Sequence, residues 1–117
     1  MAWKILFYES ESGRSPVKKF LDNLQSKVQQ KIFAYLKLLS EHGTELASNY
    51  LEKVKNGIWA LRPEYGGNEY RIFFFMSDKK IILVHAILKN TRQLPKTDVK
   101  TAENRMEEWL QRQKGGR

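Results

Sequence analysis

The sequence predicts a single α+β domain, in which helices pack on a mostly antiparallel sheet. The spacing of apolar residues follows the helical period over residues 17–39, alternates as in strands over residues 58–88, and returns to the helical period from residue 97. Turn-forming residues separate these segments, and 41% of the 117 residues are hydrophobic, which is enough for a core. The expected order is β-α-α-β-β-β-α over one domain, residues 1–117.

In the N-terminal half, residues 2–9 are rich in aromatic and branched side chains and predict a first strand. Ser15 and Pro16 predict the start of a short helix, because serine caps a helix and proline is tolerated in its first turn. A second helix is expected from near Ser26 to His42, ended by Gly43. We expect the two helices to form a helical hairpin, or nearly so.

Residues 44–57 are ambiguous and fit either a loop or a short strand. Three strands are expected at 58–62, 70–76 and 81–88, with a flexible connection at 64–68 and a four-residue hairpin turn at 77–80. The last strand is apolar on both faces, so we expect it to be central. The partner of the first strand is not determined by the pattern.

The C-terminal segment returns to a helical pattern from Pro95 or Thr97. One apolar stripe is expected along this helix, and residues 113–117 are expected to form a frayed tail. The stripe consists of Val99, Ala102, Met106, Trp109 and Leu110.

Composition excludes several classes of protein. Cysteine is absent, which excludes a disulfide framework, a thiolate zinc site and a cysteine nucleophile. No apolar run approaches the roughly 20 residues that span a bilayer, and the N-terminus reads as a strand rather than a signal peptide, so we expect a cytoplasmic protein. The net charge of +8 predicts a polyanionic partner, either nucleic acid or an acidic protein.

Three cations occupy informative places in the apolar half. Arg71 interrupts an otherwise apolar strand, Arg62 ends the preceding strand, and Lys89 follows the next one. In an antiparallel arrangement these three positions meet at one end of the sheet, where Arg92 and Lys96 in the following loop join them. One arginine on a strand more often points outward and covers the sheet with its side chain. The functional hypothesis therefore depends on the expectation that all three cations lie together.

Converging cations suit the cleavage of RNA by its own 2′-hydroxyl. The transition state carries extra negative charge on a pentacoordinate phosphate, and an arginine fork donates two parallel hydrogen bonds to the phosphate oxygens. A lysine held among like charges has a lowered pKa and is suited to proton transfer. No cofactor is expected, and no metal, because no group of carboxylates or histidines has ligand spacing.

The other chemical motifs are weaker. We interpret His85 as a core residue with a satisfied ring and His42 as part of a helix end. Gly66 and Gly67 lack the lysine and hydroxyl residue of a phosphate-binding loop and indicate a turn. Residues 73–75 are interpreted as core rather than as a surface for base stacking.

Taken in order, the segments 58–62, 66–74, 82–91, 95–96 and 102–106 resemble the phage-derived branch of the RelE/HigB toxin superfamily. The resemblance implies a microbial-RNase-like α+β fold and metal-independent cleavage of mRNA on the ribosome. It also implies an antitoxin, usually a helix-turn-helix protein, with a toxin–antitoxin heterotetramer. By position it assigns Arg71 to transition-state stabilisation and Arg62 and Lys89 to phosphate orientation.

The chain departs from the family in two respects. Some relatives carry lysines inside the strand that ends at Arg62, where this chain has Ile58 and Ala60; Lys53 and Lys55, just upstream, are candidates to replace them in RNA binding. Some relatives use a tyrosine near the last helix, and this chain has none after Tyr70. The general acid and base therefore stay open.

Two alternatives to a nuclease also stay open. The first is a catalytically silent module of the same fold that binds RNA or the ribosome, with strongly salt-dependent affinity. The second is a regulatory protein whose basic face binds an acidic protein partner, in a complex insensitive to ribonuclease.

Overall fold

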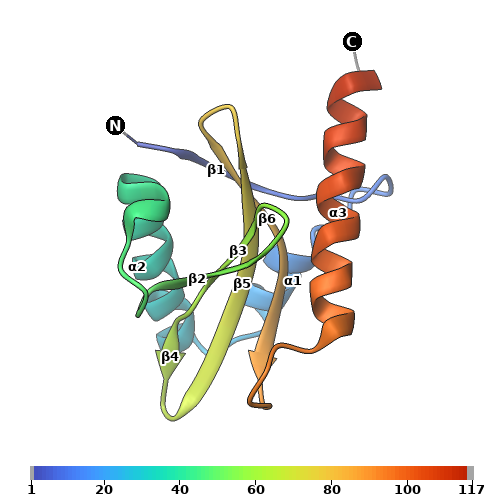
Figure 1. The fold of residues 1–117 in the computed structure, drawn as a ribbon. Helices are drawn as coiled ribbons and strands as arrows, with labels where there is room; N and C mark the ends of the chain where they lie inside the picture. The colour runs from blue at the N-terminus through green and yellow to red at the C-terminus, as the bar shows by residue number, and fades with distance from the viewer. Residues whose placement is uncertain (1, 116–117) are drawn as a thin grey trace.

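The computed structural model describes residues 2–115, which form one six-stranded sheet, three α-helices and a short 3-10 helix (Figure 1). In chain order, these elements are β1 (Lys4–Phe7), α1 (Pro16–Asp22), α2 (Ser26–His42), η1 (Gly43–Glu45), β2 (Leu51–Lys55), β3 (Ile58–Leu61), β4 (Glu64–Tyr65), β5 (Asn68–Ser77), β6 (Lys80–Lys89) and α3 (Lys96–Gly115). The predicted α+β class is confirmed.

The strands follow the order β1-β6-β5-β3-β2, and β4 pairs with β5 beside this path. β1 pairs with β6 in parallel, and the other pairs are antiparallel, so the sheet is mixed. The expected hairpin of β5 and β6 is confirmed, and β6 lies inside the sheet as expected. β2 shows that the ambiguous segment 44–57 contains a short strand, which was one of the two alternatives. β4 was not expected, because it lies in the connection predicted to be flexible.

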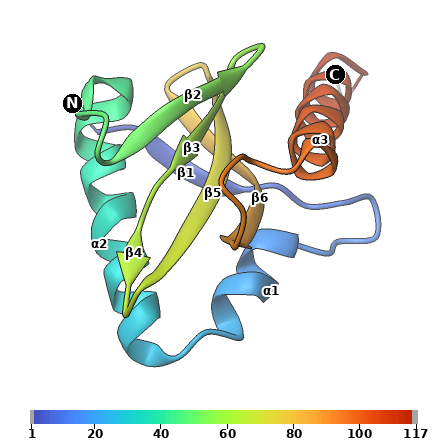
Figure 2. The ribbon, with the colours of Figure 1, turned by 60° about the horizontal axis from the view of Figure 1, so that its bottom comes forward.

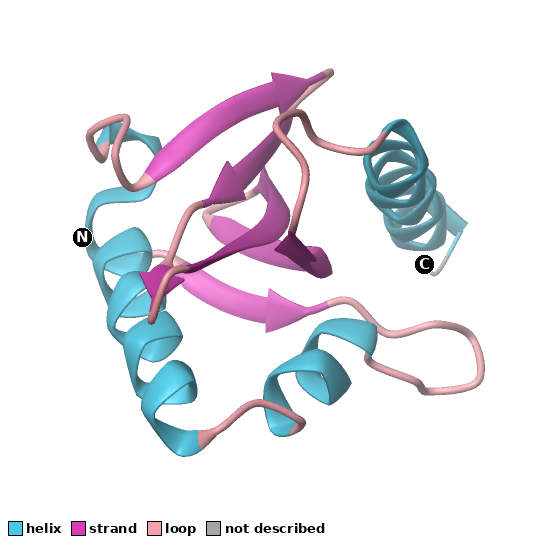
Figure 3. Cartoon of the chain, turned by 90° about the horizontal axis from the view of Figure 1, so that it is seen from below, coloured by secondary structure: helices cyan, strands magenta, loops and turns pink. Residues whose placement is uncertain are grey.

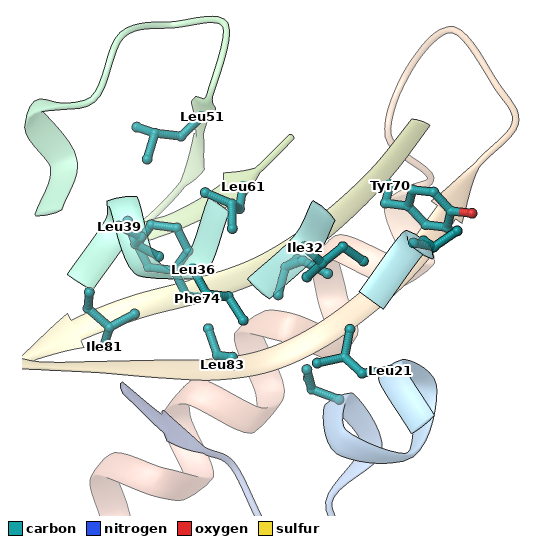
Figure 4. Packing of buried hydrophobic residues seen from close by; sticks show 13 residues of the cluster. Leu21, Ile32, Leu36, Leu39, Leu51, Leu61, Tyr70, Phe74, Ile81 and Leu83 are labelled. Atoms are coloured by element: carbon teal, nitrogen blue, oxygen red, sulfur yellow. The ribbon is translucent and has the colours of Figure 1, made fainter. Parts of the chain in front are cut away.

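The helices cover the two faces of the sheet separately, α1 and α2 on one face and α3 on the other (Figures 2 and 3). α1 packs mainly on β6 and makes few contacts with α2, so the expected helical hairpin of these two helices is not observed. Both helices cover the same core cluster, in which Ile32 and Leu39 of α2 meet Phe74 of β5 and Leu83 of β6 (Figure 4).

A β-bulge shifts the pairing of β5 with β6 after Phe73. Phe73 lies opposite His85, and Phe74 lies opposite Leu83, so Val84 is the extra residue. Val84 belongs to the apolar cluster under α3, and His85 contacts Phe73 and α3 on the same side. The bulge therefore places the residues of β6 that follow Val84 on the opposite face from the one that regular alternation would give them.

Both predicted loops beside β5 are shorter than expected. Ser77 pairs with Lys80, which leaves a two-residue turn at Asp78 and Lys79, both with positive φ. Gly66 and Gly67 form another two-residue turn, with φ of +60° and +83°, between β4 and β5. Positive φ at both central residues matches the twist of a hairpin, which explains why these turns close tightly.

The helix ends follow the local sequence closely. The Ser15 side chain accepts a hydrogen bond from the Lys18 amide, and Pro16 lies in the first turn of α1. α2 ends at Gly43, whose φ is +59°. α3 continues to Gly115, so the expected tail is wrong for residues 113–115; residues 116–117 lie outside the described part.

On α3, Trp109 and Met106 pack on the sheet as expected, whereas Leu110 is 37% exposed and does not belong to the buried stripe. Within residues 2–115, no helix has the length and apolar character needed to cross a membrane.

Candidate functional site

A cleft of about 930 Å³ opens at the end of the sheet where β3 ends, β5 begins and β6 ends. Its other walls are β2 and the first two turns of α3. All seven cations predicted as site residues line this one cleft: Lys53, Lys55, Arg62, Arg71, Lys89, Arg92 and Lys96. The structure therefore confirms that these side chains meet at one end of the sheet.

Strand alternation explains why these side chains share one face. Phe73 and Phe75 lie in the cluster beneath α3, so Arg71, two residues earlier on β5, points to the same side. Ile87 lies opposite Arg71 and Lys89 opposite Glu69, which extends this face to the end of β6. α3 begins only at Lys96 and leaves this end of the face open.

Arg71 is nearly inaccessible, with 2% of its surface exposed, and is held by three partners. Its Nε donates to Glu52 Oε1 at 3.0 Å, its Nη1 to the Tyr70 carbonyl at 2.8 Å, and its Nη2 to Glu69 Oε1 at 3.1 Å. A buried guanidinium needs such compensation, because an unpaired buried charge is costly. These bonds fix the position of Arg71, and two of its five N–H groups have no hydrogen-bond partner among the described residues.

The two carboxylates that hold Arg71 each contact a second cation. Glu52 Oε1 lies 3.5 Å from Arg62 Nε, and Glu69 Oε1 lies 3.9 Å from Lys89 Nζ. Arg62 also donates from Nη1 to the Ser48 carbonyl at 2.6 Å. The floor of the cleft is therefore an alternating chain of charges in the order Arg62, Glu52, Arg71, Glu69, Lys89.

The rim of the cleft is formed by exposed cations from three different parts of the chain. In the described residues, none of them forms an ion pair, and Lys53 Nζ lies 5.9 Å from the centre of the Trp59 ring. Cations on a rim retain their full attraction for a polyanion, whereas the floor cations are partly neutralised by glutamates. These rim residues are Lys53, Lys55, Arg92, Lys96 and Lys100.

The chemistry available in the cleft is that of guanidinium, ammonium and carboxylate groups. Neither histidine nor tyrosine is among its lining residues in the described part of the chain. Within residues 2–115, no group of three or more His, Cys, Asp or Glu is placed to hold a metal ion. The arrangement can bind phosphate through cations and can accept a proton through a carboxylate.

His85 lies outside the cleft and connects β6 to α3. Its Nε2 lies 2.7 Å from Asp98 Oδ1, and its Nδ1 lies 3.1 Å from Nη1 of Arg105, which can only donate. Nδ1 therefore accepts, and Nε2 carries the proton and donates to Asp98. Burial lowers the pKa of His85, the Arg105 charge adds to that effect, and Asp98 opposes it. The predicted satisfied ring of His85 is confirmed, but its side chain is 16% exposed, so it is not the core residue that was expected. His42 is exposed at the end of α2.

Four charged cleft residues were missed from the sequence: Glu52, Glu69, Lys100 and Glu103. Glu69 carried a readable signal, because it precedes Arg71 by two residues in the same strand and therefore shares its face. Glu52 carried none, since the strand that contains it was ambiguous. Lys100 follows Lys96 by one helical turn, which places the two on one side of α3.

Comparison with known proteins gives two findings. The model of the family described as phage-derived protein Gp49-like (DUF891) matches residues 19–107. The chain is also similar to the protein named probable endoribonuclease HigB1 in two strains of Mycobacterium tuberculosis, CDC 1551/Oshkosh and ATCC 25618/H37Rv. In both cases the identity is 27% over 107 residues, covering 92% of this chain and 83% of the relative.

Proposed function

Because this chain belongs to the Gp49-like family of phage-derived proteins, which is of the RelE/HigB type, we propose that it is an endoribonuclease toxin that cleaves mRNA on the ribosome. The observation that carries the proposal is the alternating chain of charges on the cleft floor, with Arg71 fixed at its centre. A fixed guanidinium is already oriented for charge that develops on the phosphoryl oxygens, so little reorganisation is needed in the transition state.

In the proposed reaction, the 2′-oxygen of a nucleotide attacks the adjacent phosphorus. The new P–O2′ bond forms as the P–O5′ bond breaks, which gives a 2′,3′-cyclic phosphate and a 5′-hydroxyl. Arg71 stabilises the extra charge on the phosphoryl oxygens, and Arg62 and Lys89 orient the phosphate. Lys53, Lys55, Arg92 and Lys96 bind the neighbouring backbone phosphates.

We assign proton removal from the 2′-hydroxyl to Glu52. This carboxylate lines the cleft, is about one-third exposed, and lies between Arg62 and Arg71, which are the two groups proposed to bind the phosphate. A carboxylate is ionised at neutral pH and can accept a proton, whereas an ordinary lysine is already protonated. The leaving 5′-oxygen then takes its proton from a rim lysine, for which Lys53 and Lys55 are the candidates.

The further parts of the proposal are an antitoxin and a cytoplasmic location. The proposed antitoxin is a helix-turn-helix protein that binds the toxin in a heterotetramer. The family and the relative named HigB1 support an antitoxin partner, and the basic cleft offers an acidic segment of such a partner the same cations that bind RNA. Copurification of the tagged chain with the product of its neighbouring gene tests this part.

The test of the nuclease is induced expression of the wild type and of Arg71→Lys, with growth followed and the 5′ ends of ribosome-bound mRNA mapped. Lysine keeps the charge but loses the fork, so cleavage is expected to fall sharply at equal soluble level. Lys27→Ala, an exposed change on α2, is the control and should cut like the wild type. A soluble wild type that leaves growth unchanged and produces no new ends would refute the nuclease and favour the silent binding module.

A further inference from the structure

A second pocket, of about 780 Å³, lies between α3 and the loop that joins β1 to α1. α3 contributes to both pockets: its residues 96–103 line the cleft, and Arg105 lines the second pocket. The two differ in charge, because three glutamates line the cleft, whereas no carboxylate is among the described lining residues of the second pocket. The lining residues are Tyr8, Ser10, Ser12, Arg14, Ser15, Pro16, Lys19 and Arg105.

Arg105 has a fixed position in this pocket. Its Nη1 donates to the Val84 carbonyl at 2.9 Å and to His85 Nδ1 at 3.1 Å, and the guanidinium carbon lies 5.8 Å from the centre of the Tyr8 ring. Among residues 2–115, its Nε and Nη2 have no hydrogen-bond partner. The β-bulge brings His85 to this side of the sheet, so a feature of the backbone orients a guanidinium that still has donors available.

The other polar groups of the pocket also have hydrogen atoms to donate. Arg14 and Lys19 are exposed and form no ion pair within the described part of the chain. Ser15 Oγ accepts from the Lys18 amide, which leaves its hydroxyl hydrogen free to turn outward. Ser10 Oγ accepts from the Arg14 amide and lies 3.0 Å from Ser12 Oγ, so one of these two hydroxyls donates to the other and only one of their hydrogens stays free. The nearby carboxylate of Glu108 is engaged by the Tyr8 hydroxyl and by Arg112.

We propose that this second pocket binds a phosphate group of the RNA whose scissile phosphate occupies the cleft. Three cations and several hydroxyls around one hollow, with no carboxylate among them, match the charge and the acceptor oxygens of a phosphodiester. Such a contact places the RNA along α3 from the cleft, lined by residues 96–103, to Arg105, and it carries no base preference. The inference rests on the proposed RNA substrate.

The test measures binding of the full chain to a short 2′-O-methyl RNA, which has no free 2′-hydroxyl and is not cleaved. Affinity is measured over a range of salt concentrations for the wild type and for Arg14→Ala/Lys19→Ala. The matched control is Lys27→Ala/Lys37→Ala, which removes two equally exposed charges from α2. Loss of two of the three cations around this one phosphate is expected to lower affinity about tenfold at low salt and to reduce the log–log salt slope by about one.

Equal affinity and slope for the pocket variant and the α2 control would overturn the proposal. A second arm titrates inorganic phosphate and follows the amide resonances of residues 10–19 by NMR. Weak phosphate binding that RNA displaces supports an RNA site, whereas phosphate binding as tight as RNA binding would overturn it in favour of a small-anion site. Mapping of mRNA ends separates this result from the proposed function: a changed slope without cleavage refutes only the nuclease, and cleavage with an unchanged slope refutes only the second pocket.

Discussion

Glu52 on β2 contacts Arg71 on β5 across the intervening strand β3, with 3.0 Å between Oε1 and Nε. The edge strand β2 is thus joined to the middle of the sheet by a charged side-chain contact as well as by its backbone pairing with β3. The same oxygen lies 3.5 Å from Arg62 Nε, so one carboxylate organises the two arginines that we propose to bind the phosphate.

The two ion pairs of Glu52 are expected to differ in strength. Arg71 is buried and hydrogen-bonded to Glu52, whereas the side chain of Arg62 is 34% exposed and its Nε is too far from Glu52 for a good hydrogen bond. In double-mutant cycles with alanine, measured by urea unfolding, we expect a coupling of about 1–3 kcal/mol for Arg71 with Glu52. For Arg62 with Glu52 we expect less than about 1 kcal/mol. A larger value for the Arg62 pair would contradict the assignment of Arg71 as the centre of the site.

Glu52→Gln tests the proposed proton acceptor. The amide keeps the size of the side chain and an oxygen that accepts from Arg71, but it is a very weak base. The rate constant of mRNA cleavage is expected to fall about 100- to 10,000-fold, with little change in RNA affinity. Glu103→Gln, which removes another cleft carboxylate that does not contact Arg71, is the control and should cleave nearly as fast as the wild type. An unimpaired Glu52→Gln enzyme would transfer the role to a lysine.

His85 makes stability depend on pH in a known direction. Because burial lowers its pKa in the folded state, the unfolded chain binds more protons as the pH falls below about 6.5. The contribution of His85 to the free energy of unfolding is therefore complete above that pH and is lost as the pH falls toward the lowered pKa. Protonation also puts a hydrogen on Nδ1, which then cannot accept from Arg105.

Urea unfolding at neutral and mildly acidic pH measures this effect. His85→Gln is expected to lose less stability than the wild type between the two pH values, and His42→Gln is expected to behave like the wild type because that histidine is exposed. The idea fails if the wild type and His85→Gln lose the same stability on acidification.

Gly43 follows the last residue of α2 and packs against the side chain of Trp3, and both features favour glycine at this position. Its φ is +59°, and a Cβ atom there would lie 2.8 Å from Nε1 of Trp3, which is closer than non-bonded atoms approach. Gly43→Ala is expected to destabilise the protein by about 2–4 kcal/mol, through backbone strain and a steric clash together. Gly57→Ala is the control, since its φ is +87° but nothing lies within 4 Å; it should cost about 1–2 kcal/mol in thermal or urea unfolding. Equal losses would show that the Trp3 contact is relieved cheaply.

The α+β class, the start of α1, the extent of α2, the hairpin of β5 and β6, and the cations that meet at its open end all follow from the sequence alone. These features depend on short-range rules: the period of apolar residues, a serine cap followed by proline, and the alternation of side chains along strands. Arg62, Arg71 and Lys89 follow from those rules, because strand order and antiparallel pairing place them at one end.

The tertiary structure alone decided the parallel pairing of β1 with β6, the strand β2 with Glu52, and the β-bulge that brings His85 toward Arg105. Each depends on contacts between residues that are distant in the sequence, or on one extra residue in a strand. Local propensity does not distinguish a loop from an edge strand. One extra residue in a strand moves every later side chain of that strand to the opposite face of the sheet. Whether Arg71 faces water or two carboxylates was therefore a property of the assembled sheet.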